Sequence, residues 1–111
     1  MISLTPESVD LSKLMDWYSA HCDGDWEHSS GVSIETLDNP GWLLKVNLIG
    51  TNLADVEMPD WSEGCDEDSH TESSPWISCS VQGGEFVGAS DPSQLPRLIS
   101  VFNALIDAVP R

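Results

Sequence analysis

The segment His21–His28 holds the densest group of residues in this chain that could carry out chemistry. It contains two histidines, one cysteine and three carboxylates within eight residues. Histidine and cysteine are the usual zinc ligands, so a metal site is one interpretation of this segment. However, the ligand spacing matches no standard zinc pattern, and the other two cysteines and His70 lie far away in the sequence. The alternative is structural: Asp23-Gly24 ends a helix in a turn, and Trp26 packs on the core.

The chain offers few of the arrangements that catalysis needs. It has no Gly-x-Ser-x-Gly motif, and Gly83-Gly84 fits a hairpin turn better than a phosphate-binding loop. A dyad of Cys22 and His28 is conceivable, but a reactive thiolate needs electropositive neighbours, and here the neighbours are acids. Surface acids such as Asp23 and Asp25 are more often solvated than catalytic. The sequence therefore predicts a protein that is not an enzyme and that uses no metal or other cofactor.

Net charge is the feature that restricts the partners of this chain. Nineteen acidic residues face four Lys and Arg, which gives a formal net charge of −15 over 111 residues. No Lys or Arg lies between Lys45 and Arg97, and the part of that gap from Asp55 to Glu72 carries eight acids. Such a charge opposes nucleic-acid binding, which needs cations to neutralise phosphates. It fits a cationic partner, or a stand-alone domain adapted to a salty cell.

The acidic segment is predicted to be an exposed loop at about residues 55–72. Pro59 and Gly64 interrupt it, and its charges lie too close together for a buried element. It also contains Trp61, and a large apolar side chain ringed by carboxylates is typical of an interface hot spot. Folding of Trp61 back onto the sheet as a lid is the alternative.

The elements around these segments predict an α+β fold in one domain, residues 1–111. A helix with its cap at Thr5-Pro6 ends near His21, and its apolar stripe is predicted to be Leu11, Leu14, Met15 and Tyr18. Two antiparallel hairpins follow, with strands at about 32–36 and 42–49, then 76–81 and 86–88. They are expected to form one sheet flanked by the N-terminal and C-terminal helices.

The C-terminal helix has the clearest pattern. Asp91, Pro92 and Gln94 fit a capping box, and Pro110 ends the helix. Its predicted apolar stripe consists of Leu95, Leu98, Ile99, Phe102, Leu105 and Ile106.

The location of the protein is predicted from what the sequence lacks. No apolar run approaches the roughly 20 residues that span a bilayer, and no signal peptide is recognised at the start. Three cysteines without paired spacing fit a reducing compartment. We therefore expect a cytoplasmic protein that binds neither membrane nor nucleic acid.

Several of these motifs together resemble a known family. The run from Cys22 to His28, the run from Gly31 to Trp42, Gly50-Thr51 and Leu14-x-x-Trp17-Tyr18 are similar to the immunity protein 53 family. The resemblance is specific over about residues 11–53 and looser in the last strands and helix. These are bacterial immunity proteins of polymorphic toxin systems, so the resemblance implies a protein that binds and neutralises a cognate protein toxin.

Together with the charge, the resemblance predicts a basic toxin of the nuclease type, held by acidic surface complementarity. The alternative function is a metal-binding module or metal-dependent enzyme that uses the His21–His28 cluster. The candidate toxin-binding residues are Asp23, Asp25, Trp26, Glu27, His28, Asp60, Trp61, Glu63, Asp66, Glu67 and Asp68.

Overall fold

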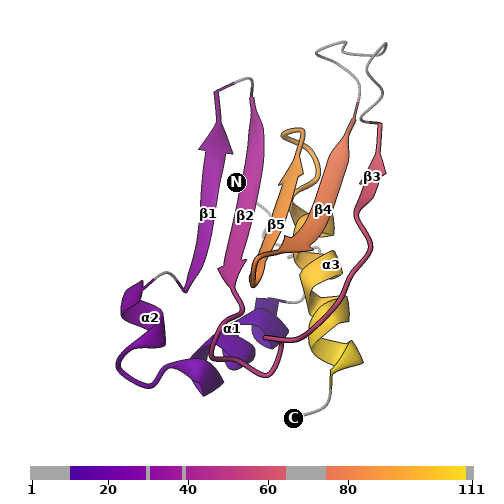
Figure 1. The fold of residues 1–111 in the computed structure, drawn as a ribbon. Helices are drawn as coiled ribbons and strands as arrows, with labels where there is room; N and C mark the ends of the chain where they lie inside the picture. Colours follow the sequence, from indigo (N-terminus) through magenta and orange to yellow (C-terminus); the bar gives the residue numbers. More distant parts are fainter. Residues whose placement is uncertain (1–10, 30, 39, 65–74, 110–111) are drawn as a thin grey trace.

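Five antiparallel strands and three helices make up the fold in a computed structural model, which describes residues 11–29, 31–38, 40–64 and 75–109. In sequence order, the elements are α1 (Leu11–His21), α2 (Trp26–Ser29), β1 (Val32–Leu37), β2 (Gly41–Asn47), β3 (Trp61–Glu63), β4 (Ile77–Gln82), β5 (Glu85–Ser90) and α3 (Leu95–Ala108). The strand order in the sheet is β1-β2-β5-β4-β3 (Figure 1). The predicted α+β class is confirmed.

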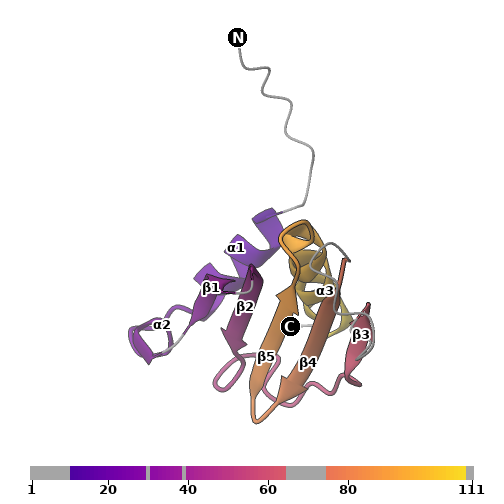
Figure 2. The same cartoon turned by 90° about the horizontal axis from the view of Figure 1, so that it is seen from above.

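The helices α1 and α3 lie on the same face of the sheet, and no described helix covers the other face (Figure 2). Between the two layers lies the core, where α3 packs on β2, β4 and β5. Alternation along the strands supplies that core: Leu44, Val46 and Leu48 are fully buried, while the side chains between them are half-buried. Within the described residues, no helix has the length and apolar character that crossing a membrane requires.

Both predicted hairpins are present, and they join through β2 and β5. The second hairpin turns at Gly83 and Gly84, whose φ angles are +60° and +76°, a conformation that glycine adopts without strain. At the join, Leu44 pairs with Gly88, which faces α3. A Cβ atom on Gly88 would lie 2.9 Å from Cδ2 of Leu98, so glycine allows α3 to approach the sheet closely.

The buried face of α1 differs from the predicted stripe. Leu14 and Trp17 are buried, whereas Leu11, Met15 and Tyr18 are 44%, 62% and 37% exposed. The prediction of the α1 stripe used only the spacing of apolar residues and took no account of their size. The indole of Trp17 sets the orientation of the helix, because this large side chain fills the core and donates a hydrogen bond to Asn52 Oδ1 at 2.8 Å. The predicted cap at Thr5-Pro6 lies outside the described residues.

The start of α3 also differs from the prediction. The helix begins at Leu95 with Gln94 as its N-cap, and Pro96 lies in its first turn. Asp91 is not the cap, because its carboxylate binds the turn of residues 91–94 and the amide of Trp76 instead. The predicted stripe is confirmed, since Leu98, Ile99, Phe102 and Leu105 are buried and its other two residues pack against them. Pro110 lies outside the described residues.

Part of the acidic segment forms a strand, not the predicted loop. Residues Trp61–Glu63 form β3, which pairs with β4 so that Trp61 lies opposite Cys79. Val56 and Met58 of the same segment pack against the core. Three residues are too few for alternation to be recognised in a sequence, which is why the strand was missed. The rest of the segment, residues 65–74, lies outside the described residues.

Candidate functional site

The polar cluster before β1 is a reciprocal capping arrangement at the start of α2. Asp23 Oδ1 accepts hydrogen bonds from the amides of Asp25 at 2.9 Å and Trp26 at 3.1 Å. In return, the Glu27 carboxylate accepts the amides of Asp23 and Gly24, each at 2.9 Å. The amides of Asp25 and Trp26 favour the ionised form of Asp23 and lower its pKa. The backbone amide of Glu27 itself, followed by those of Asp23 and Gly24, lowers the pKa of Glu27 in the same way. Two of the candidate toxin-binding acids therefore build the loop.

Trp26 in the same cluster is a core residue. It is 6% exposed, and its Nε1 donates a hydrogen bond to the carbonyl of Asn47 at 3.0 Å. Its ring meets Trp17 edge to face, with centroids 5.6 Å apart and planes at 84°. Among the candidate toxin-binding residues of this cluster, Asp23, Asp25 and His28 are exposed, whereas Glu27 is half-buried.

His21 supports the core beside these rings and is not arranged as a metal ligand. Its Nε2 accepts the backbone amide of Asn52 at 3.2 Å, so Nδ1 carries the proton and donates to the Trp17 carbonyl at 2.8 Å. Both ring nitrogens are therefore engaged. The Cys22 thiol donates a hydrogen bond to the Tyr18 carbonyl at 3.2 Å. Among the described residues, no three His, Cys, Asp or Glu side chains are grouped so that they could hold a metal ion.

Cys79 is the other described cysteine and lies in β4, opposite Trp61 of β3. Burial raises the pKa of its thiol to about 11, although the Arg97 charge opposes the shift. A thiol that stays protonated at neutral pH is a poor nucleophile. Cys65 and His70, which the metal interpretation also considered, lie outside the described residues.

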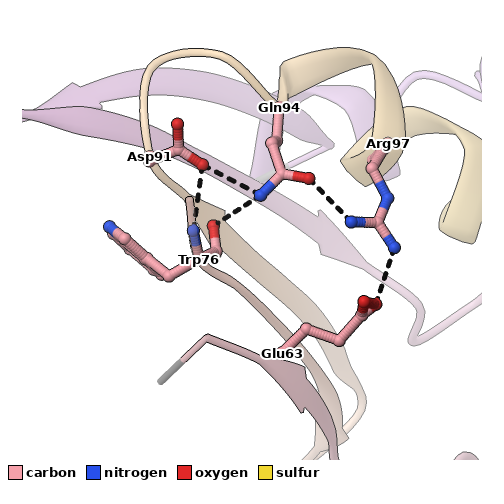
Figure 3. Close-up of polar contacts among 5 residues, drawn as sticks. All are labelled: Glu63, Trp76, Asp91, Gln94 and Arg97. Carbon is pink, nitrogen blue, oxygen red and sulfur yellow. Dashed lines mark hydrogen bonds and ion pairs between the residues drawn. The ribbon is translucent and has the colours of Figure 1, made fainter. Parts of the chain in front are cut away.

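The second candidate group lies on β3 and is held by α3. Trp61 is half-buried against the core, and the Arg97 guanidinium lies 5.4 Å from the centre of its ring. Arg97 Nη2 also binds Glu63 Oε2 at 2.8 Å, and Nη1 binds Gln94 Oε1 at 2.7 Å. Figure 3 shows how this chain of contacts runs on through Gln94 to Asp91 and the backbone of Trp76. Trp61 is thus part of the edge strand and packs against the core, instead of folding over the sheet as a lid, and its role as an interface anchor stays a prediction.

The two candidate groups lie at opposite edges of the sheet. α2 leads directly into β1, which is one edge, whereas Trp61 and Glu63 are on β3, which is the other. Asp60 is exposed just before β3. Asp66, Glu67 and Asp68 lie outside the described residues. The sequence could not reveal this separation, because it depends on β5 inserting next to β2.

Most of the described positive residues form ion pairs within the protein. The described ranges contain three Lys or Arg residues, and two of them form ion pairs: Lys13 with Asp107 at 2.7 Å and Arg97 with Glu63 at 2.8 Å. Sequence reasoning missed Arg97 as a binding partner of this group. The sequence did contain one signal for this role, because Arg97 is the first cation after a long stretch without Lys or Arg.

The fold and these surfaces define a small, strongly acidic α+β protein with carboxylates at both edges of its sheet. The chain belongs to the immunity protein 53 family, whose model matches residues 11–107. The match extends through the second hairpin and most of α3, well beyond the part in which the sequence resemblance is specific. It supports an immunity function and, in general terms, a toxin as partner. Neither the curated proteins nor the solved structures give a significant match to the chain.

Proposed function

We propose that this immunity protein binds a cognate cationic toxin of the nuclease type and neutralises it by covering a positively charged surface. The observation that carries the proposal is the charge: nineteen acids oppose four Lys and Arg, and two of the described cations are already paired within the chain. A nuclease cleft attracts phosphates, so carboxylates can occupy the same positive field. Inhibition is non-enzymatic in this proposal, and the protein acts in the cytoplasm.

The candidate residues divide into three groups under this proposal. Asp25, His28 and Asp60 are exposed and are proposed to meet the toxin directly. The same role is proposed for Asp66, Glu67 and Asp68 from their charge alone. Asp23 and Glu27 use their carboxylates on backbone amides, and Trp26 is buried, so these three act by holding the loop in shape. Trp61 and Glu63 can contribute only with Arg97 beside them.

Calorimetric titration of this protein with the toxin-like protein encoded next to it, at low and high salt, tests the proposal. We expect tight binding that weakens steeply as salt rises, together with loss of the toxin's activity. Tight binding that is insensitive to salt would keep an immunity role but contradict the acidic surface as its cause. Absence of binding at either salt would refute the proposal for that pair.

A pair of variants locates the steering charge. Neutralising Asp66, Glu67 and Asp68 together should lower the association rate and flatten its salt dependence. The matched control neutralises Asp10, Asp16 and Glu85, which lie outside the acidic segment, and so removes the same number of charges. Equal rates for the two variants would mean that only net charge matters and would remove the acidic segment from the mechanism.

A further inference from the structure

Among the described strands, β1 is an edge of the sheet with no neighbour on its outer side, and the register shows which of its residues bond β2. The amide of Asn47 donates to the carbonyl of Gly31 at 2.9 Å, so the odd-numbered residues of this strand bond β2. Backbone groups alternate in direction along a strand. The N–H and C=O groups of Val32, Ile34 and Thr36 therefore point away from the sheet, and none of them has a hydrogen-bond partner among the described residues.

The opposite edge presents much less. The two-residue turn at Gly83 and Gly84 directs the even-numbered residues of β4 to β5, which leaves Ile77 and Cys79 to bond β3. Within the three residues of β3, only the backbone of Ser62 then points outward. The Arg97 side chain also lies against this strand. An added strand could therefore form backbone hydrogen bonds with one residue of β3 but with three residues of β1.

Apolar side chains accompany the open edge. Five large hydrophobic residues are notably exposed in the described ranges, and four of them are on α1 or β1: Leu11, Met15, Tyr18 and Ile34. Ile34 points toward the helix-covered face because it pairs with the buried Leu44, yet it is 44% exposed because α3 covers the neighbouring strands instead. The Tyr18 ring approaches the start of this strand, 3.7 Å from where a Cβ on Gly31 would lie.

The strand lacks the usual protection of an edge, and its other side is acidic. Natural edge strands often carry Lys or Pro, which block further pairing, but Val32–Leu37 contains neither. Glu35 alternates with Ile34 and therefore points to the uncovered face, and exposed Asp38 follows the strand. An added strand would thus meet an apolar surface on one side and carboxylates on the other.

We infer that β1 takes up an extended segment of the toxin as a sixth strand, with apolar side chains over Ile34 and basic side chains beside Glu35. This inference rests on the proposed function and names the surface that it uses. Charge decides between a toxin segment and a second copy of this chain. Two copies would each bring a net charge of −15 to the same seam, whereas a basic segment is attracted to it.

The decisive variant is Ile34→Pro. Proline at this position removes an outward N–H and blocks strand addition, but it removes no hydrogen bond of the existing ladder. Ser62→Pro is the matched control, because it makes the same change at the outward position of β3. With the toxin-like protein encoded next to this chain, Ile34→Pro should raise the dissociation constant at least about tenfold, while Ser62→Pro leaves it unchanged.

A second readout needs no substitution in β1. Hydrogen exchange of the unmodified complex should show new protection at the amides of Val32, Ile34 and Thr36, with little change at Ser62. Unchanged affinity of a folded Ile34→Pro, or absence of that protection, would overturn the inference while leaving the proposed function intact. If the unmodified protein did not bind the toxin at all, both proposals would fall together.

Discussion

Asp91 joins the start of β4 to the turn before α3, and replacing it by Asn tests how strongly it does so. Its Oδ1 accepts the Trp76 amide at 3.1 Å and the Gln94 side-chain amide at 2.9 Å. Its Oδ2 accepts the Ser93 amide at 3.0 Å and the Ser93 hydroxyl at 2.6 Å. Asn has one oxygen, so Asp91→Asn places an NH₂ group against donors at one of these two positions.

The magnitude follows from the ionisation of Asp91. Burial raises its pKa, but the hydrogen bonds from Ser93, Gln94 and the Trp76 amide outweigh burial and bring the pKa from 3.8 down to about 2. A shift of this size corresponds to about 2 kcal/mol of stability at neutral pH, and solvent screening at this half-exposed site reduces it to about 1–2 kcal/mol. Because the folded pKa is the lower one, this stabilisation is complete above about pH 4 and is lost as the pH falls toward 2.

Urea unfolding of the two proteins at pH 7, 4 and 3 measures this difference. We expect Asp91→Asn to lower the free energy of unfolding by about 1–2 kcal/mol at pH 7, and the gap to narrow as the pH falls below 4. Asp107→Asn is the control: it loses an ion pair with Lys13 in which the Asp107 side chain is 62% exposed, and this should cost less than about 1 kcal/mol. Equal stability of Asp91→Asn and the parent at pH 7, or a gap independent of pH, would refute this account.

Two further substitutions test the contacts that hold each end of the fold. Asn52→Ala leaves the Nε1–H of Trp17, a residue that is 1% exposed, without its acceptor. We expect the free energy of unfolding to fall by about 1–3 kcal/mol, measured as a lower urea midpoint at an unchanged slope. A decrease below about 0.5 kcal/mol would show that another group replaces this hydrogen bond. Arg97→Met removes both the charge over the Trp61 ring and the ion pair with Glu63. Because both contacts lie at an exposed site, the free energy of unfolding should fall by less than about 1 kcal/mol. Iodide quenching of tryptophan fluorescence should increase, because Arg97 no longer covers the Trp61 ring. Arg97→Lys keeps the charge without the planar fork, and quenching equal to that of the parent would mean that charge alone holds Trp61 in place.

The sequence was sufficient for features that depend on local chemistry. Gly83-Gly84 predicts its hairpin because few residues accept positive φ, and the repeated leucines of α3 mark its buried face over almost four turns. Features that depend on one partner elsewhere in the chain were not predictable. The orientation of α1 depends on the hydrogen bond between the side chains of Trp17 and Asn52. These residues are 35 positions apart, so the residues around Trp17 do not predict the bond.

The candidate site shows the same division. Asp23 and Glu27 belong to a dense acidic group, and their spacing of four is one longer than that of a capping box. The sequence therefore did not distinguish residues that carry out chemistry from residues that build the loop. The open edge at β1 depends on strand order. If β5 had paired with β1 instead of β2, Ile34 would lie within the sheet and the edge would be elsewhere. The pairing of β5 with β2 depends on how the strands pack under α3, and no local sequence pattern predicts that packing.

Strand order also determines how the two edges can act together on one toxin. They are four strand spacings apart, or roughly 19 Å at about 4.8 Å each. That distance exceeds the Debye length of about 8 Å at physiological salt, so acids near β3 barely act on a partner that is seated at β1. Their influence should instead appear during approach and at low salt, as a faster association. Contacts at β1 would govern dissociation, because an added strand must break several backbone hydrogen bonds to leave. If both proposals hold, the acids near β3 and the strand pairing at β1 affect different rate constants, and the salt dependence of the association rate separates the two contributions.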